Sequence, residues 1–356
     1  ETLGSGRIWP DDGTILSYWK GWYVIVQRAN TMLVNANAAQ SENMMRYTAE
    51  ARVLRAMAYY YLIAMFGDVP FFTEPPKFEE FKCQRTSKVT ILDFVLKELD
   101  ESAKILPDWI ASERGRVDKA AAYGLMSRAA LMGGSFNYNN DAAHYFKIAA
   151  ESAEKVIGKR ELYKDFGSLF TTEGQANAHS ELIMEACFYA TGEKKDHYIG
   201  YTETSRFAGQ TGRYPTQTLF DTFECIDGKR IESSLYDPTD PKKNRDPRLY
   251  STIFITGDTI TVNTGSGKLK VILNAYEGDP NDKENYRKTL SYNYTTRTWE
   301  KVDNLDFTDP AAFSSFANAG KGYMCAKFQR DSTENIGQST VNFPILRYAE
   351  VLLNFA

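Results

Sequence analysis

The fold is decided by residues 49–70, which read AEARVLRAMAYYYLIAMFGDVP. Apolar side chains recur at helical spacing through this stretch, so we predict a helix from Tyr47 to Phe66. The helix should end sharply, because Gly67 accepts the left-handed conformation of a helix cap and Pro70 cannot continue a helix. Its core face is expected to carry Ala51, Leu54, Ala58 and Leu62.

Helical spacing also marks residues 15–39, 91–106, 117–131 and 141–157, and in the first of these we expect Trp19 and Trp22 to pack in the core. Many facing positions are alanine, which lets neighbouring helices approach closely. Gly133 and Gly134 are expected to break the chain between the last two helices. We therefore predict a mainly α fold of divergent, tetratricopeptide-like helix pairs, each burying its apolar face against its neighbours.

The second half of the chain has a different character. Loops and short extended runs dominate residues 159–340, and the runs 251–255 and 259–262, separated by Gly257 and Asp258, predict a small β-hairpin. Helical character returns over 342–356, where Arg347 and Glu350 are spaced for a pair within one helix. We predict one domain over 1–356: a helical-repeat scaffold (14–158), a loop-rich ligand-binding part with small β-hairpins (159–340) and a returning helix (342–356).

The composition excludes several classes of function. The net charge is −4 and no Lys/Arg run is long, so nucleic acid is not expected as a partner. Four cysteines and three histidines are scattered, which indicates no metal site, and no cofactor motif occurs. The 22 tyrosines and 21 phenylalanines supply flat apolar rings of the kind that pack cores and stack against sugars.

The sequence carries no signature of an enzyme. The patterns GxSxG, GxGxxG, GxxxxGK[ST] and HExxH are all missing from it. The 46 Asp and Glu residues are too many to single out a catalytic pair. We expect a binding protein, with a helical glycoside hydrolase and a pure protein-interaction scaffold as the alternatives.

Five groups of stretches, in this order, resemble one family, the SusD/RagB-like outer-membrane nutrient-binding lipoproteins. The resemblance covers essentially the whole chain, and its most specific part is the stretch from residue 49 to residue 70. Within it, Arg52 and Arg55 are expected to pair with glutamates such as Glu50 and to serve the fold. The stretches are 19–30; 49–70; 106–131 with 163–170; 215–228 with 245–249; and 327–328 with 343–354.

The resemblance implies a function. Members of this family are lipid-anchored at the cell surface in the outer membrane and sit as a lid on a SusC-type TonB-dependent transporter. They capture oligosaccharides, or in some members peptides, and pass them inward. The chain begins without a signal peptide or lipid-anchor cysteine and stops within an apolar helical pattern, so we expect it to be a piece of a longer protein.

Ligand contacts are expected on loops, where aromatic faces meet the apolar side of a sugar and charged groups meet its hydroxyls. Trp9 precedes the first helix and lies where members of the resembled family contribute glycan contacts. Asp11 and Asp12 follow it, although beside Pro10 and Gly13 they also suit a solvated turn. A second loop, just before Pro215, interleaves aromatic and basic residues. The candidate contacts are Trp9, Asp11, Asp12, Tyr201, Arg206, Arg213 and Tyr214.

Overall fold

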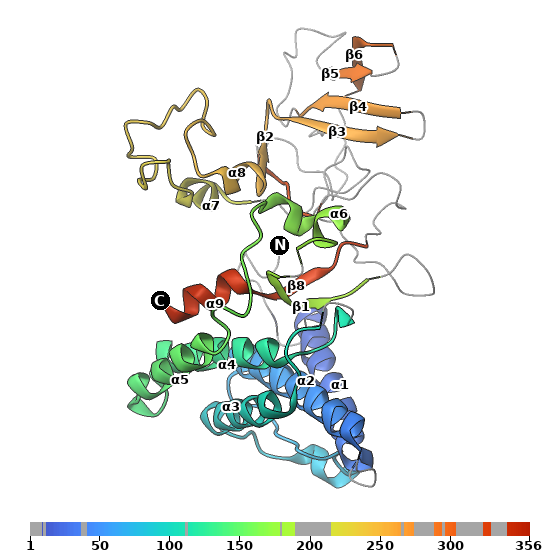
Figure 1. Ribbon diagram of the computed structural model, residues 1–356, viewed down its shortest axis with the longest axis vertical. Helices are drawn as coiled ribbons and strands as arrows, with labels where there is room; N and C mark the ends of the chain where they lie inside the picture. The colour runs from blue at the N-terminus through green and yellow to red at the C-terminus, as the bar shows by residue number, and fades with distance from the viewer. Residues whose placement is uncertain are drawn as a thin grey trace. The chain divides into compact units, whose positions relative to one another are not determined.

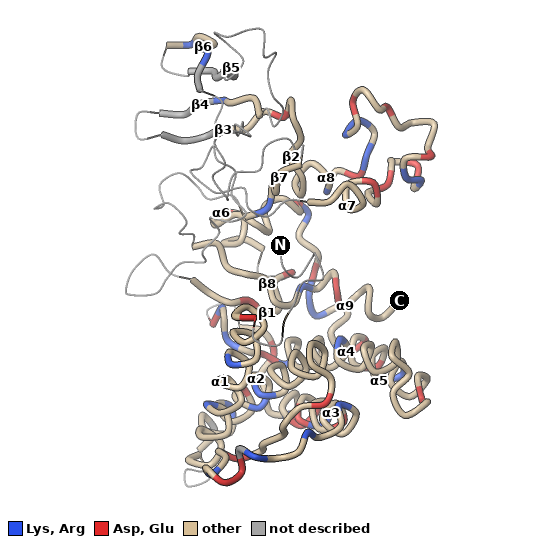
Figure 2. The backbone as a smooth tube through the Cα atoms, turned by 180° about the vertical axis from the view of Figure 1, so that it is seen from behind, with Lys and Arg blue, Asp and Glu red and all other residues tan. Residues whose placement is uncertain are grey.

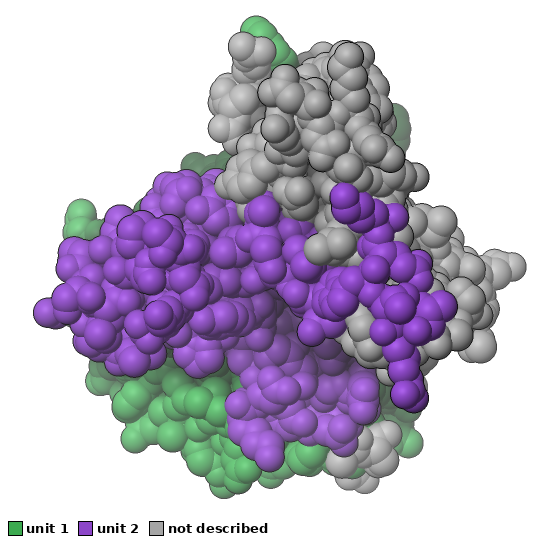
Figure 3. Space-filling model, turned by 90° about the horizontal axis from the view of Figure 1, so that it is seen from above, with its two compact units in different colours: residues 1–162, 179–185, 344–356 green, residues 163–178, 186–343 purple. Residues whose placement is uncertain are grey.

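The chain forms two compact units, coloured separately in Figure 3. Unit 1 comprises residues 1–162, 179–185 and 344–356, and unit 2 comprises residues 163–178 and 186–343. A computed structural model describes residues 9, 12–36, 41–110, 113–178, 180–188, 215–264, 267–273, 288–293, 296–303, 323–328 and 340–356.

Unit 1 is a stack of helices with a two-stranded sheet. Helices α1 to α5 pack in chain order, each against the next, and α9 contacts α4 and α5 (Figure 1). The strands β1 and β8 pair with each other. The elements are α1 (Gly13–Ala36), α2 (Glu42–Phe66), the 3-10 turn η1 (Phe78–Lys82), α3 (Lys88–Ile105), α4 (Lys119–Ser135), η3 (Tyr138–Asn140), α5 (Ala142–Glu154), β1 (Leu182–Ala186), β8 (Phe343–Arg347) and α9 (Tyr348–Phe355).

Unit 2 holds short helices and small antiparallel sheets. Strand β2 pairs with β7, and β3, β4, β5 and β6 form a four-stranded sheet in that order. The elements are η4 (Gly167–Phe170), α6 (Thr172–Gln175), α7 (Gln217–Thr222), α8 (Pro247–Tyr250), β2 (Ile253–Ile255), β3 (Thr259–Thr264), β4 (Gly267–Ile272), β5 (Lys288–Asn293), β6 (Thr298–Asp303) and β7 (Tyr323–Cys325). The expected mainly α architecture is confirmed.

Local sequence explains where the helices of unit 1 begin and end. Ser41 caps α2 by accepting from Met44 N at 3.2 Å, and Asp118 caps α4 by accepting from Ala121 N at 2.8 Å. At the other end of α2, Gly67 has a φ of 69° and its N–H bonds to Ile63 O at 3.0 Å. The sharp stop predicted from Gly67 and Pro70 is therefore present.

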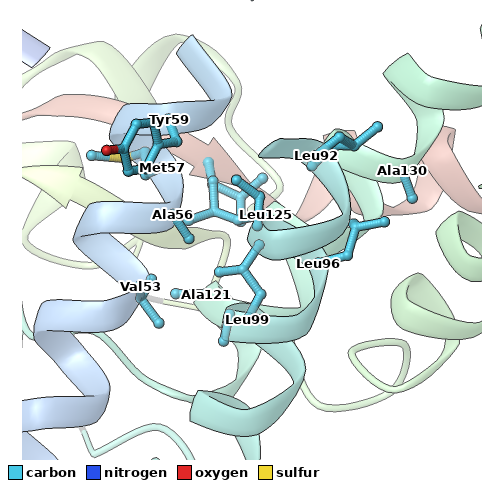
Figure 4. Close-up of a cluster of buried hydrophobic side chains, with 14 of the residues drawn as sticks. Val53, Ala56, Met57, Tyr59, Leu92, Leu96, Leu99, Ala121, Leu125 and Ala130 are labelled. Atoms are coloured by element: carbon cyan, nitrogen blue, oxygen red, sulfur yellow. The ribbon is translucent and has the colours of Figure 1, made fainter. Parts of the chain in front are cut away.

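The core of unit 1 lies where α2, α3 and α4 meet (Figure 4). Ala58 and Leu62 are buried as predicted, but Leu54 is 36% exposed, so the predicted face of α2 was partly wrong. Helix α2 carries apolar side chains on all its sides. Its contacts with α1 and α3 therefore decide which of these side chains are buried. Trp19 and Trp22 pack against the core, as predicted. The buried apolar positions of α2 are Ala49, Val53, Ala56, Met57, Ala58, Tyr59, Leu62 and Ile63.

The predicted break at Gly133 and Gly134 was also wrong, because α4 continues through both to Ser135. These glycines allow close packing. A Cβ on Gly133 would lie 2.7 Å from Leu92 Cδ2 and 2.9 Å from the Tyr145 ring, and one on Gly134 would lie 2.6 Å from the Phe146 ring. The chain turns only after the helix, at Asn137, which has a φ of 49°.

The predicted hairpin between residues 251–255 and 259–262 does not form. Strand β2 pairs instead with β7, and β3 pairs with β4. Ile253 is fully buried with Phe220 and Leu249, which holds β2 against a different partner. The backbone of the turn is bonded to Leu273, which accepts from Gly257 N at 2.9 Å and donates to Asp258 O at 2.8 Å.

The end of the chain differs from the predicted helix over 342–356. Residues 343–347 form strand β8 on β1, and the helix starts at Tyr348. Arg347 and Glu350 do not pair with each other: Arg347 Nη1 bonds to Glu181 Oε1 at 2.7 Å, and Glu350 Oε1 accepts from Arg128 Nε at 2.5 Å. The two side chains therefore connect this end of the chain to partners more than 160 residues earlier.

Candidate functional site

Trp9 lies immediately before α1 and is 72% exposed, so its side chain is available to a ligand. The backbone anchors it, because Asp12 N donates to Trp9 O at 3.0 Å. Asp12 itself caps α1: its Oδ1 accepts from Thr14 N at 2.8 Å and from Ile15 N at 3.4 Å. The turn suggested by the neighbouring proline and glycine is thus a helix start, and one oxygen of Asp12 is occupied there.

The other candidate contacts, Asp11, Tyr201, Arg206, Arg213 and Tyr214, lie outside the described residues. These five contacts therefore stay predictions.

A groove follows α1 in unit 1, with a volume of about 500 Å³. We call it the α1 groove. Its lining combines rings and prolines with a few polar side chains, and includes Trp19, Tyr23, Gln27, Phe72, Pro75 and Pro76.

The wall of the α1 groove opposite α1 is the irregular segment that contains Phe72. Polar side chains of α1 and α2 form hydrogen bonds to the backbone of this segment. Asn30 Nδ2 donates to Phe72 O at 3.0 Å and to Glu74 O at 3.1 Å, and Tyr23 OH donates to Pro70 O at 2.6 Å. The Tyr59 hydroxyl donates to Phe72 O at 2.8 Å and accepts from Phe72 N at 2.7 Å. Burial raises the pKa of both tyrosines far above the ordinary value, so both hydroxyls stay protonated as donors.

A second hollow, of about 670 Å³, opens in unit 2. We call it the unit-2 hollow. Three chain segments line it, residues 164–167, 224–228 and 246–251, and their lining side chains include charged groups and one aromatic ring, that of Phe166. In the sequence, parts of these segments stood out only because they resemble the SusD/RagB-like family. The turn residues in Asp-Phe-Gly, Asp-Gly and Asp-Pro-Arg mark each segment locally as a turn. They do not show that the three segments meet, because that depends on contacts between residues distant in sequence.

Basic and acidic positions are interspersed along the helices of unit 1 (Figure 2). Within the described ranges, no group of three or more His, Cys, Asp or Glu side chains is arranged to hold a metal ion. Among those same ranges, every helix is too short or too polar to cross a membrane.

Two segments of the chain match known sequence families. Residues 5–131 match a SusD-like family described as "Starch-binding associating with outer membrane", and residues 180–356 match the SusD family.

Curated relatives are similar to about half of the chain. A SusD-like protein of Formosa agariphila is 34% identical over 178 residues, which are 48% of this chain and 31% of that protein. The starch-binding protein SusD of Bacteroides thetaiotaomicron is 28% identical over 180 residues, which are 50% of this chain and 31% of that protein. The match thus spans less than a third of either relative.

Solved structures share the fold over nearly the whole chain. A SusD-like carbohydrate-binding protein from Bacteroides fragilis superposes with a TM-score of 0.75 at 23% identity, covering 98% of this chain and 61% of that one. A laminarin-binding SusD-like protein superposes with a TM-score of 0.55 at 20% identity, covering 95% of this chain and 65% of that one.

Proposed function

The chain belongs to the SusD/RagB family, and on this premise we propose that it is part of a lipid-anchored cell-surface protein that captures oligosaccharides and delivers them to a SusC-type TonB-dependent transporter. The observation that carries the proposal is the match of two separate segments, 5–131 and 180–356, to SusD families, one of them described by starch binding and the outer membrane. The protein works by binding and release, without covalent chemistry.

The proposed ligand contacts are Trp9 with Asp11 and Asp12 and, from the later loop, Tyr201, Arg206, Arg213 and Tyr214. The exposure of Trp9 supports this site, because a free indole face is the usual platform for the apolar side of a sugar ring. While Oδ1 caps α1, Asp12 Oδ2 makes no hydrogen bond to another described residue, so its lone pairs can accept from sugar hydroxyls.

A peptide is the second candidate ligand, and the α1 groove is the observation that favours it. Extended, proline-containing peptides dock into grooves lined by aromatic rings. Trp19, Tyr23 and Phe72 supply such a lining, and the exposed Gln27 beside them can bond to a peptide backbone.

Affinity electrophoresis tests the proposed function. The protein is run in native gels that contain starch, laminarin, xyloglucan or no polysaccharide, and we expect at least one polysaccharide to retard it. Equal migration in all gels would count against glycan capture, and retardation only by added peptides would favour the second candidate.

Two further measurements separate the remaining alternatives. A reducing-end assay on the same polysaccharides should stay at background, and release abolished by a single Asp or Glu substitution would identify a hydrolase instead. Purification from outer membranes should yield a large TonB-dependent barrel together with the protein. The barrel without any bound glycan or peptide would favour a pure interaction scaffold.

A further inference from the structure

The unit-2 hollow has the size and the polar lining of a small-molecule site. Ligand pockets commonly enclose about 300–1,000 Å³, and this hollow has a volume of about 670 Å³. All its lining residues belong to unit 2.

Buried contacts fix two of the three segments that line the hollow. Cys225 and Arg245 form an isolated antiparallel bridge, and Asp246 N donates to Glu224 O at 2.8 Å. Arg245 is 2% exposed, and its Nη2 donates to Phe220 O at 2.9 Å and to Phe223 O at 2.6 Å. The loops that carry Glu224 and Asp246 are therefore held in place before a ligand arrives, which lowers the entropy cost of binding.

The third segment is brought close by Gly167. A Cβ at this position would lie 2.9 Å from Ser251 Oγ, so only glycine allows this approach without a shift of Ser251. Asp165 is oriented by two bonds, since its Oδ1 accepts from Gly167 N at 3.1 Å and its Oδ2 accepts from Ser168 Oγ at 2.5 Å. The bond from Ser168 lowers the pKa of Asp165, so this carboxylate stays charged at neutral pH.

Donors and acceptors with unused capacity surround the hollow. Arg248 is paired with Asp246 through Nε and Nη2, which leaves its Nη1 without a bond to any described residue. Glu224 is exposed, and within the described part of the chain its carboxylate makes no hydrogen bond or ion pair. Lys164 is also exposed and, over the same residues, forms no hydrogen bond.

An apolar surface completes the hollow. Phe166 is half-buried, packs edge-to-face on Phe170 with ring centres 5.2 Å apart, and has Lys327 Nζ at 4.8 Å from its ring centre. These contacts fix the ring within the wall. Aromatic rings that are fixed in this way offer apolar area at little entropic cost.

Sugar hydroxyls both donate and accept, so they suit a site that offers both cationic donors and carboxylate acceptors together with one ring. The hollow has three carboxylates, Asp165, Glu224 and Asp246, against two cations, Lys164 and Arg248. This negative balance disfavours uronic acids and sulfated sugars. We propose that the unit-2 hollow is a second glycan-binding subsite, selective for uncharged sugars; this inference rests on the proposed function of glycan capture.

Calorimetry of three variants tests the subsite. Glu224→Ala and Arg248→Ala each remove an exposed group that lines the hollow, and Glu232→Ala removes an exposed glutamate of the same unit that does not line it. Each is titrated with malto-, laminari- and xylogluco-oligosaccharides and with oligogalacturonate of matched length. We expect Glu224→Ala and Arg248→Ala to weaken binding of an uncharged oligosaccharide by about tenfold, the value of one charge-assisted hydrogen bond. Glu232→Ala should stay within about twofold of the unaltered protein.

The possible results separate the two proposals. If the unaltered protein binds an uncharged oligosaccharide and both hollow variants behave like Glu232→Ala, the subsite is overturned and glycan capture stands. If oligogalacturonate binds as tightly as the uncharged sugars, the selectivity is overturned. If no oligosaccharide binds the unaltered protein, the proposed function fails and the subsite fails with it.

Discussion

Arg55 and Glu98 form a two-pronged ion pair between α2 and α3, with Arg55 Nε donating to Glu98 Oε2 at 2.9 Å and Nη2 donating to Oε1 at 2.7 Å. The two side chains are only 6% and 8% exposed. Arg55 Nη1 also donates to Asn30 Oδ1 at 2.6 Å and to Thr73 O at 2.8 Å. One guanidinium thus joins α1, α2, α3 and the wall of the α1 groove.

We predict that Arg55→Ala destabilises the protein by about 3–5 kcal/mol, because it leaves Glu98 charged and buried without its main partner. Arg52→Ala is the matched control. Arg52 lies on the same helix, 35% exposed, at 4.0 Å from Glu98 and 3.8 Å from Glu101, and its loss should cost no more than about 1 kcal/mol. Urea unfolding of both variants measures the difference, and equal losses would contradict a special role for Arg55.

The substitutions Gly133→Ala and Gly21→Ala should change the stability of the protein in opposite directions. Alanine favours a helix over glycine by about 1 kcal/mol, and at Gly21 in α1 a Cβ would meet nothing within 4 Å. Gly21→Ala should therefore be stabilising. Gly133→Ala forces a Cβ against Leu92 and Tyr145 and should cost about 1–3 kcal/mol by overpacking. Thermal melts of the two variants that shift in the same direction would refute the close packing of α4.

Tyr145 gives a pH-dependent prediction. Its hydroxyl donates to Asp93 Oδ1 at 3.0 Å, and burial together with this bond raises the pKa of Tyr145 from 10.0 to about 12. The folded state therefore holds the proton more tightly than the unfolded state. The resulting stability is complete below pH 10 and is lost as the pH rises through about 12.

Tyr145→Phe should cost about 1 kcal/mol near neutral pH, the value of one hydrogen bond. The difference in unfolding free energy between this variant and the unaltered protein should shrink between about pH 10 and pH 12. Urea unfolding at both ends of that range measures it. If this difference in unfolding free energy stays constant or grows over that range, folding does not raise the pKa of Tyr145.

The sequence predicted the helices of unit 1 well because their signals are local. The stop at Gly67 acts within a few residues and was predicted correctly. The start of α2 at Glu42, capped by Ser41, lies five residues before the predicted start at Tyr47. The buried face of α2 was harder to predict, because Val53 and Leu54 are both apolar. Only the neighbouring helices decide that Val53 is buried and Leu54 is not.

Features that depend on distant contacts escaped prediction. The sequence indicated a helix end at Gly133 and Gly134. Both glycines lie instead within α4, where a side chain would collide with Leu92, Tyr145 or Phe146. The partner of β2 lies about 70 residues later in the chain, too far for a hairpin rule to find. The unit-2 hollow likewise joins three segments, and no periodicity or spacing rule connects Gly167 with Ser251.

Titration calorimetry of the unaltered protein and Trp9→Ala with malto-, laminari- and xylogluco-oligosaccharides tests glycan capture most directly. Because Trp9 is 72% exposed, its loss should leave the melting temperature unchanged. We predict measurable binding of at least one oligosaccharide by the unaltered protein and at least about fivefold weaker binding by Trp9→Ala, since an aromatic platform contributes about 1 kcal/mol or more. Equal affinities would remove Trp9 from the site, and absence of binding by the unaltered protein would contradict glycan capture itself.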